Sequence, residues 1–304
     1  MLYCHNRYDF YICGKKLGSK LRNLKNISII FSSSRATKEV LNKTFEVIDQ
    51  SGSNICACLP VNKLATKLAK EKISKSDLIL VIGGDGTMIG SIRELNELNI
   101  PFLGINLGRV GFLTDINPNN IVSLEKILKG QFIKEKRPIF QASTTSKKKE
   151  IFINEVVIHS GSVAKMIDLE ISAGRESIYQ LKADGIIVSS PTGSTAYSYS
   201  GGGPVVSPKV NALTLLPMFS HSSSSHSLLM PENKNIEVKI KNTENLSAEI
   251  VLDAKKIIKY TRKGISISKT KKYFYLYHPK DYNYFEACRT KLGWAFPIEN
   301  IKND

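Results

Sequence analysis

The sequence predicts an α/β N-terminal domain with a parallel sheet, followed by a β-rich C-terminal domain. Three observations support this fold class. The first third of the chain alternates strand-like and helix-like segments, as a parallel sheet requires. Residues 78–82 contain no polar residue, which is typical of a strand covered on both faces. After Asp115, short strand-like segments follow one another, separated by Gly, Ser, Asn and Lys.

The chain has 304 residues, enough for two domains with cores of their own. We expect the α/β domain to span residues 1–118, with 279–304 returning to it, and the β-rich domain to span 119–278. In the first domain the expected strands are 27–31, 55–59, 78–82 and 102–105, and the expected helices are 36–50, 61–70 and 88–98. Gly52 suits the C-cap of the first helix. We expect right-handed connections between the parallel strands.

The second half is expected to open with a short helix at 121–128. Its expected strands are 151–159, 167–172, 185–189, 236–240 and 265–267. A final helix over 282–292 has Phe285, Cys288 and Leu292 on one face, and we expect that helix to pack back onto the first domain. The Ser- and His-rich residues 220–227 are expected to form a flexible loop.

The charge of the chain is strongly positive, with 43 Lys and Arg residues against 27 Asp and Glu, a formal net charge of +16. The lysines are scattered rather than gathered in one aromatic-studded stripe, so we interpret the charge as compositional bias and expect no nucleic-acid partner. The lysine runs at 147–149 and 269–272 are expected in turns between strands. A basic protein still favours encounter with phosphate-bearing ligands.

The cysteines and the apolar segments indicate a cytoplasmic protein. Five cysteines offer one close pair, Cys56 and Cys58, and no second cluster at metal-binding spacing, which argues against a zinc site. An odd number of cysteines without a secretory signal indicates reduced thiols. Residues 1–20 lack the apolar core of a signal peptide, and no later stretch approaches the ~18 apolar residues that a membrane span needs.

The most informative motif is Gly83-Gly84-Asp85-Gly86-Thr87, which directly follows the apolar run 78–82. In open α/β sheets, ligands bind at the carboxyl ends of the strands. Glycines allow positive φ and close approach of the backbone to a ligand, and peptide N–H groups near a helix start can face an anion. We therefore expect a phosphate at this turn. The structural alternative is that Asp85 or Thr87 only caps the following helix.

A second glycine-rich segment, 106–115, also follows an apolar strand. Gly108 and Gly111 are typical of a plain turn, but this turn would lie beside Asp85 at the same sheet edge. Phe112 and Leu113 then either wall a base-binding slot or belong to the core. No G-x-S-x-G and no Walker loop occurs in the chain, so we expect nucleotide chemistry to depend on the Asp85 turn.

Asn154 and Glu155 form a polar pair after the apolar residues 151–153. An amide beside a carboxylate suits the hydroxyls of a ribose or the edge of a base, because Asn donates and accepts hydrogen bonds and Glu accepts them at both oxygens. A satisfied turn is the structural alternative.

The segment 182–204 is dense in hydroxyls and glycines. Short donors and acceptors, open backbone and the ring of Tyr197 suit a nucleotide pocket. We prefer this to a linker of similar composition, because apolar strands bound the segment on both sides. Its candidate binding residues are Lys182, Asp184, Thr192, Thr195, Ala196, Tyr197 and Ser200.

Taken in this order, the motifs at 83–87, 106–115, 154–155, 184–185 and 191–197 resemble those of the NAD kinase family. The resemblance runs from about Ile27 to Asp281 and into the last helix. It implies transfer of the terminal phosphoryl group of ATP to the adenosine 2′-hydroxyl of NAD, giving NADP, with a divalent cation such as Mg²⁺. It also implies a homodimer or homotetramer, in which some residues of the pocket come from a neighbouring subunit.

The resemblance assigns a role to each candidate residue. Asp85 is expected to act as the general base or to orient the 2′-hydroxyl, while Gly83, Gly84, Gly86 and Thr87 face phosphates. Asn154 and Glu155 are expected to hold the NAD, and Phe112 and the binding residues of segment 182–204 to line its pocket.

Two segments depart from the family pattern. The chain has Leu252-Asp253-Ala254-Lys255 where Phe-Asp-Gly-Gln is usual, and His226 where an Arg is usual, which replaces a permanent cation by a pH-dependent donor. Two other functions stay open at this stage. One is a lipid or sphingoid-base kinase that shares the Gly-Gly-Asp-Gly turn, and the other is a non-catalytic dinucleotide sensor.

Overall fold

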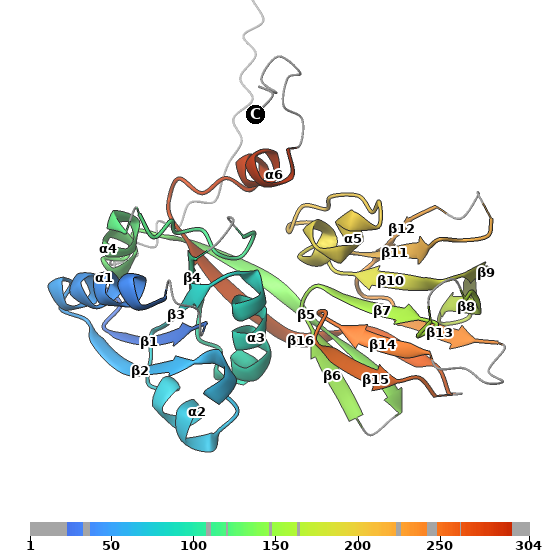
Figure 1. Ribbon diagram of the computed structural model, residues 1–304, viewed down its shortest axis with the longest axis horizontal. Coiled ribbons are helices and arrows are strands. Elements are labelled where there is room, and N and C mark those ends of the chain that lie inside the picture. Colours follow the sequence, from blue (N-terminus) through green and yellow to red (C-terminus); the bar gives the residue numbers. More distant parts are fainter. Residues whose placement is uncertain are drawn as a thin grey trace, which may run out of the picture.

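The structure, a computed structural model, describes residues 23–32, 37–107, 111–119, 121–145, 148–162, 165–222, 226–241, 248–261 and 263–293. Gly108, Lys147, residues 1–20 and parts of the expected loop 220–227 lie outside these ranges. Two lobes stand side by side, and two long strands, β5 (Ile133–Thr145) and β16 (Ile265–His278), run from one lobe to the other (Figure 1).

The first lobe has the expected alternation of parallel strands and helices. Its strands are β1 (Asn26–Phe31), β2 (Asn54–Pro60), β3 (Leu78–Gly83) and β4 (Phe102–Asn106). They pair in parallel in the order β2-β1-β3-β4. Every residue of β3 and β4 is buried, which confirms the interpretation of the apolar run 78–82.

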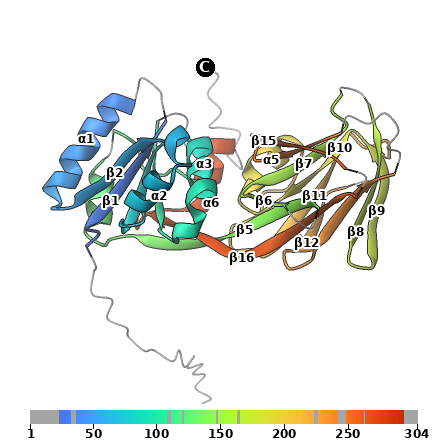
Figure 2. The same ribbon diagram turned by 90° about the horizontal axis from the view of Figure 1, so that it is seen from below.

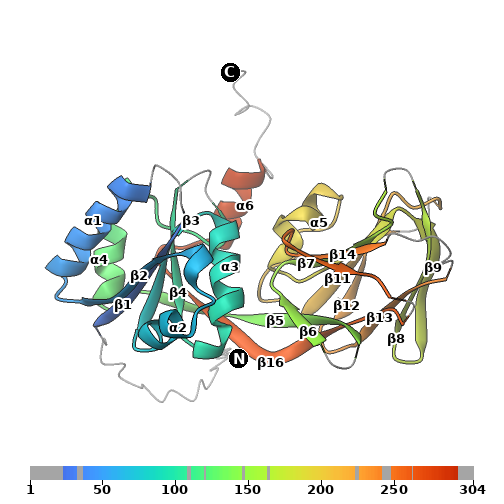
Figure 3. The same cartoon turned by 60° about the horizontal axis from the view of Figure 1, so that its bottom comes forward.

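Helices cover both faces of this sheet, as Figure 3 shows. One apolar cluster joins a sheet face to α1 (Thr37–Gln50) and α4 (Val122–Leu128), and another joins the opposite face to α2 (Lys67–Ile73) and α3 (Asp85–Leu95). The first lobe is therefore a three-layer α/β/α unit, and its strand ends are the available edge for a ligand.

Two expected helices have different bounds in the structure. Residues 61–70 are not one helix: a 3₁₀ turn (Val61–Lys63) precedes α2, which begins after Thr66 because the Thr66 hydroxyl accepts a hydrogen bond from the Ala69 amide at 3.2 Å. Helix α3 begins at Asp85 rather than Met88, since the carbonyl of Gly84 already accepts from Thr87 and Met88. Residues Asn96–Leu98 continue it as a 3₁₀ turn.

The second lobe is a sandwich of two antiparallel sheets (Figure 2). One sheet has the order β12-β11-β10-β7-β14-β15, and the other consists of β16, β13, β8 and β9, with β5 and β6 attached. The remaining strands are β6 (Lys148–Phe152), β7 (Glu155–His159), β8 (Ile167–Ala173), β9 (Glu176–Ala183), β10 (Gly185–Ser189), β11 (Ala212–Met218), β12 (Leu228–Pro231), β13 (Ile236–Ile240), β14 (Glu249–Leu252) and β15 (Lys256–Lys259). One apolar core lies between the sheets, and it includes Val188 and Leu213 of one sheet and Val238 and Ile267 of the other.

Three expectations for this lobe are wrong in detail. Residues 151–159 form two strands, β6 and β7, because the carboxylate of Asp253 binds the amides of Ile153 and Asn154 between them. The expected strand 265–267 is only the start of β16. The lysine run 269–272 lies inside β16, at an irregularity of its pairing with β5, rather than in a turn between strands.

The long strand β16 joins the lobes into one sheet, since it pairs with β13 and β5 in antiparallel fashion and with β4 in parallel. Helix α6 (Tyr284–Leu292) follows it, capped by Asn283 at its start and by Gly293, at φ 61°, after its end. Figure 3 places α6 above the gap between the lobes, near α3 and α5 (Tyr197–Ser200).

The expected apolar face of the last helix is only partly correct, because Cys288 is buried while the Phe285 side chain is 53% exposed. Within the described residues, no helix is both long and apolar enough to cross a membrane.

Candidate functional site

The two glycine-rich segments meet at one edge of the first-lobe sheet, as expected. Asp85 follows β3, and its carboxylate accepts hydrogen bonds from the amides of Phe112 at 2.7 Å and Leu113 at 3.0 Å. A side chain at Gly111 would place its Cβ 1.9 Å from Oδ1 of Asp85, so only glycine fits there. The carboxylate is thus held by the loop after β4.

Asp85 does not cap the helix that it begins. The N-cap of α3 is Gly84, without a hydrogen bond from a side chain, so the capping alternative is wrong. Positive φ is not needed either, since Gly83, Gly84 and Gly86 all lack it. A Cβ at Gly83 would meet Thr87 Oγ1 at 2.6 Å, whereas a Cβ at Gly84 or Gly86 would meet nothing within 4 Å. Open space therefore lies beside two of the three glycines.

Asn154 lies between β6 and β7, and Glu155 is the first residue of β7, next to Asp253 of the β14–β15 turn. Asp253 Oδ1 accepts from the amide of Asn154 at 2.7 Å, and the carbonyl of Glu155 accepts from the amide of Asp253 at 3.1 Å. The carbonyl of Asn154 accepts from the amide of Ser190 at 2.8 Å, and Gly193 packs against that carbonyl so closely that a Cβ would lie 2.3 Å away. The backbone of the pair is therefore satisfied.

The side chain of Glu155 is 3% exposed, and no described residue offers a hydrogen-bond partner to its Oε2. Burial, together with the nearby charge of Asp253, raises the pKa of the Glu155 carboxyl to about 8. A buried carboxyl with a raised pKa and a free oxygen in a cavity wall is a feature of functional sites.

The departure from glycine at Ala254 does not prevent the turn. Asp253 and Ala254 both adopt left-handed conformations, with φ of 49° and 55°, and the amide of Lys255 donates to the carbonyl of Leu252 at 3.1 Å. The lysine then reaches across to the first lobe, where its Nζ donates to the carbonyl of Gly86 at 3.1 Å. The turn that carries Asp253 thus contacts the turn that carries Asp85.

The hydroxyl-rich segment is a defined loop and not a linker. It folds into a 3₁₀ turn (Gly193–Thr195) and α5. The hydroxyl of Ser194 donates to the carbonyl of Pro191 at 2.8 Å and accepts from the amide of Val206 at 3.0 Å. Thr192 is buried, whereas Thr195 and Ala196 are partly exposed and Tyr197 and Ser200 are exposed.

A cavity of about 480 Å³ on the second lobe brings several of these motifs together. Glu155, Asp184, Tyr197 and Ala254 line it, together with Val157, His159, Ser160, Ser162, Met218, Phe219 and Val251. Lys182 is not part of this lining: it lies on β9, beside Asp168 and Lys241 in a different hollow. The apolar wall was missed from the sequence, because a fully apolar strand does not reveal which of its side chains face outward.

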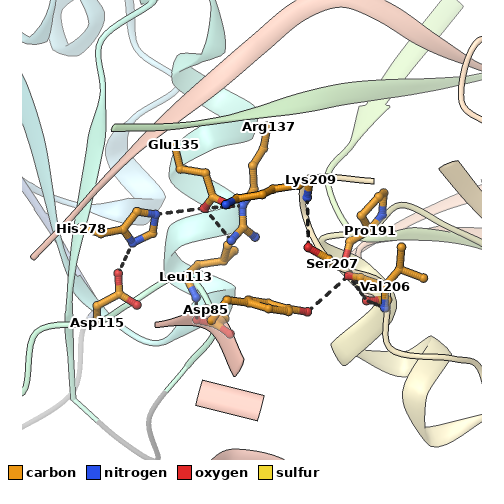
Figure 4. A network of polar contacts seen from close by, with 12 residues as sticks. Asp85, Leu113, Asp115, Glu135, Arg137, Pro191, Val206, Ser207, Lys209 and His278 are labelled. Carbon is orange, nitrogen blue, oxygen red and sulfur yellow. Dashed lines mark hydrogen bonds and ion pairs between the residues drawn. The ribbon is translucent and has the colours of Figure 1, made fainter. Parts of the chain in front are cut away.

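A second polar cluster was also missed, and it lies beside the Asp85 loop (Figure 4). His278 at the end of β16 contacts Asp115 through Nδ1 and Glu135 through Nε2 at 3.0 Å, and Arg137 pairs with Glu135 at 2.8 Å. Burial alone would raise the pKa of Glu135, but the hydrogen bond from His278 and the charge of Arg137 outweigh it and hold that pKa at about 2. Burial alone would lower the pKa of His278, but the hydrogen bonds to Asp115 and Glu135 and the charges of these carboxylates raise it.

Within the described residues, no group of three or more His, Cys, Asp or Glu side chains is arranged to hold a metal ion. Mg²⁺ in nucleotide sites is usually bound through one or two carboxylates together with substrate phosphates and water. The residues around Asp85 fit only that arrangement.

Sequence models of known families match both lobes. The model of the ATP-NAD kinase N-terminal domain matches residues 19–132, and that of the C-terminal domain matches residues 153–278. An NAD kinase of Pseudomonas fluorescens is 36% identical over 267 residues, covering 86% of this chain and 90% of that protein. An NAD kinase of Wigglesworthia glossinidia brevipalpis is 40% identical over 261 residues, covering 84% of this chain and 88% of that protein.

Solved structures show the same fold. The crystal structure of an NAD kinase from Archaeoglobus fulgidus in complex with ATP superposes with a TM-score of 0.73 at 24% identity, over 88% of this chain and 98% of that one. Yeast NADH kinase complexed with NADH superposes with a TM-score of 0.78 at 20% identity, over 92% of this chain and 91% of that one.

Fold and sequence together define a phosphotransferase with an N-terminal α/β lobe and a C-terminal β-sandwich. The chain belongs to the NAD kinase family.

Proposed function

We propose that this protein transfers the terminal phosphoryl group of ATP to the adenosine 2′-hydroxyl of NAD, forming NADP and ADP. The observation that carries the proposal is the placement of Asp85. Its carboxylate is held at the sheet edge by the amides of Phe112 and Leu113, and its turn contacts, through Lys255, the turn that adjoins the Glu155 cavity. A fixed carboxylate whose turn contacts the wall of a cavity of about 480 Å³ suits an acceptor hydroxyl.

Asp85 acts on the acceptor hydroxyl. Oδ1 accepts from the amide of Leu113 and, at 3.4 Å, from the hydroxyl of Thr114, whereas Oδ2 accepts, among the described residues, only from the amide of Phe112. Oδ2 therefore keeps a lone pair that can accept a hydrogen bond from the 2′-hydroxyl. In the reaction, a bond forms between the 2′-oxygen and the terminal phosphorus, and the bond from that phosphorus to the leaving ADP oxygen breaks. The hydroxyl proton passes to Asp85 or to water. Positioning supplies most of the catalysis in such transfers.

The NAD occupies the cavity of the second lobe. We assign its adenosine half to Asn154 and Glu155 and the rest of the contacts to Asp184, Thr192, Thr195, Ala196, Tyr197 and Ser200, with Phe112 on the side of the first lobe. With a pKa of about 8, Glu155 is mostly protonated at neutral pH and can therefore donate a hydrogen bond as well as accept one.

The phosphates face the start of α3. The amides of Gly84 and Gly86 lie at the N-terminus of that helix, where the helix dipole favours an anion, and both positions have open space beside them. The amide of Thr87 already donates to the carbonyl of Gly84, so Thr87 offers its hydroxyl to a phosphate. Asp85 is the carboxylate at this turn that would hold a divalent cation such as Mg²⁺ together with the donor phosphates, and the cation would neutralise part of their charge.

The proposal extends to the setting of the enzyme. We assign residues 1–118 with 279–304 to the α/β domain, together with α4, which packs against the sheet of that domain, and the rest of 119–278 to the β-rich domain. We assign the assembly to a homodimer or homotetramer. A cytoplasmic location agrees with the free thiols of Cys56, Cys58 and Cys288.

The test is an activity matrix with purified protein, ATP and Mg²⁺, and with NAD, NADH, diacylglycerol or sphingosine as acceptor. NADP should form, and Asp85→Asn should lower kcat at least 10³-fold while the far-UV circular dichroism stays unchanged. Phosphorylation of a lipid instead of NAD would support the lipid-kinase alternative, and NAD binding without product from any donor would support a sensor.

A further inference from the structure

The loop that holds Asp85 is itself held by the C-terminal segment. Residues 111–115 provide the amides that bind the Asp85 carboxylate. Three side chains that follow one another along the end of the chain contact this loop: His278 at the end of β16, and Tyr284 and Lys291 of α6. None of them forms a hydrogen bond or ion pair with Asp85, and apart from the through-space attraction between the charges of Lys291 and Asp85, their contacts reach Asp85 through the loop.

Lys291 makes the most direct of these contacts. Its Nζ donates a hydrogen bond to the carbonyl of Gly111, the residue that packs against the Asp85 carboxylate. The same ammonium lies 4.6 Å from the centre of the Phe112 ring, within the range of a cation–π contact. Burial lowers the pKa of Lys291, although the charges of Asp115 and Asp85 oppose that change. One cation thus contacts both residues that precede the Leu113 amide.

Tyr284 extends the contact to the other lobe. Its ring lies 6.2 Å from that of Phe112, and its hydroxyl donates to the carbonyl of Val206 at 3.3 Å. Val206 in turn binds Ser194 of the hydroxyl-rich loop. Figure 4 shows the two sides facing each other, with Asp85 and Leu113 opposite Val206 and Pro191. Helix α6 therefore connects the loop around Asp85 to the loop proposed to line the NAD pocket.

We propose that Lys291 is a positioning residue for phosphoryl transfer, which acts by fixing residues 111–113 and through them the direction of the Asp85 carboxylate. The inference rests on the role of Asp85 proposed above. The stem of a Lys side chain is flexible, so the specific contribution of Lys291 is its ammonium, which donates to the carbonyl of Gly111 and lies over the ring of Phe112. A misplacement of about 1 Å at a reacting group can cost on the order of 10²-fold in rate.

The inference separates the effect on turnover from the effect on binding. Without the ammonium, the loop loses one hydrogen bond and one cation–π contact, but neither the Glu155 cavity nor the start of α3 loses a residue. Phe112, the one proposed NAD contact that Lys291 touches, keeps its ring contact with Tyr284. We therefore expect kcat to fall while the KM values for NAD and ATP change little.

The experiment compares Lys291→Met, which keeps the length and apolar stem, with Arg289→Met, which removes an exposed cation from the same helix. We expect kcat to fall about 10- to 100-fold for Lys291→Met, with both KM values within about threefold of wild type, and Arg289→Met to match wild type. Lys291→Arg should restore most of the turnover, because a guanidinium can donate to the same carbonyl. Thermal unfolding is measured in parallel for every variant.

Wild-type turnover for Lys291→Met would overturn the inference, as would a loss that appears only in KM. If Lys291→Met unfolds below the assay temperature, Lys291→Ala assayed at lower temperature with and without propylamine decides: recovery of kcat with the amine supports the inference, and no recovery contradicts it. Asp85→Asn in the same series separates the two proposals. Full turnover in Asp85→Asn would refute the role of Asp85, whereas loss in Asp85→Asn without loss in Lys291→Met would refute only the positioning role.

Discussion

The amide of Phe112 donates a hydrogen bond of 2.7 Å to the carboxylate of Asp85, although 27 residues separate the two in the chain. This contact ties the loop after β4 to the turn after β3, at the edge where parallel strands present their carboxyl ends. It also leaves the carboxylate in one orientation, because Leu113 binds the other oxygen.

Gly111→Ala should remove most of the activity without unfolding the protein. The new Cβ would lie 1.9 Å from Oδ1 of Asp85, so either the loop or the carboxylate must move. We expect kcat to fall at least about 10²-fold. Gly90→Ala is the control, since its Cβ meets Val61 at an ordinary 3.4 Å, and it should stabilise α3 by about 0.5–1 kcal/mol with unchanged turnover. Equal turnover in the two variants would contradict the account.

The stability of the protein should depend on pH through Glu155. Its pKa is about 8 in the folded state against 4.5 for the free group, so the folded protein keeps a proton that the unfolded chain loses, and stability falls as pH rises from about 4.5 to 8. Glu155→Gln removes this dependence, and we expect its free energy of unfolding to exceed the wild-type value increasingly from pH 5 to pH 8, by a few kcal/mol at most. Urea unfolding at three pH values measures this free energy, and Glu176→Gln, at an exposed position, is the control. The same pH dependence of the free energy of unfolding in wild type and Glu155→Gln would refute the prediction.

His278 should stabilise the fold mainly at low pH. Its pKa is raised by Asp115 and Glu135 against the effect of burial, so its contribution is complete below about pH 6.5 and is lost as pH rises through the higher folded value. We expect His278→Gln to cost about 3 kcal/mol at pH 6, because buried charges lose their partner, and less at pH 9. Unfolding of His226→Gln, at an exposed position, provides the comparison. A loss independent of pH would show that His278 is neutral.

Sequence reasoning located the strands and turns that carry the Asp85 geometry. The apolar runs of β3 and β4 and the glycines after them predict a shared sheet edge, because burial on both faces and tight turns are local properties. The break between β6 and β7 was not predictable, since it depends on Asp253, which lies 100 residues from Ile153. For the same reason the contact of His278 with Asp115, 163 residues apart, leaves no local signal.

In the candidate site, too, local sequence signals predict some positions and contacts between distant parts of the chain decide others. Asp184 and Tyr197 line the same cavity as Glu155, as their motifs indicate. Asp184 directly precedes β10 and Tyr197 follows β10 in the chain, and β10 pairs with β7, the strand that Glu155 begins. Lys182 lies only two residues before Asp184, yet it belongs to β9 of the other sheet and points to another hollow. The chain passes from one sheet to the other between β9 and β10, so Lys182 and Asp184 lie in different hollows although they are close in the sequence.

Lys255→Gln should weaken the binding of ATP more than that of NAD. Lys255 brings a charge to the carbonyl of Gly86, at the turn where the donor phosphates are proposed to lie. We expect the KM for ATP to rise about two- to tenfold, with a smaller effect at high salt, because an exposed charge is screened. Steady-state kinetics at two ionic strengths measure the effect, and Lys234→Gln, an exposed lysine of the second lobe, is the control. An unchanged KM for ATP at low salt would exclude this role.

The central claim is that the Asp85 carboxylate meets the hydroxyl that accepts the phosphoryl group. A crystal structure of the complex with NAD and a non-hydrolysable ATP analogue tests it most directly. The account predicts the adenosine 2′-oxygen within hydrogen-bond distance, about 2.6–3.2 Å, of a carboxylate oxygen of Asp85. A bound adenosine whose 2′-oxygen lies beyond the reach of Asp85, with another side chain at that oxygen, would contradict it.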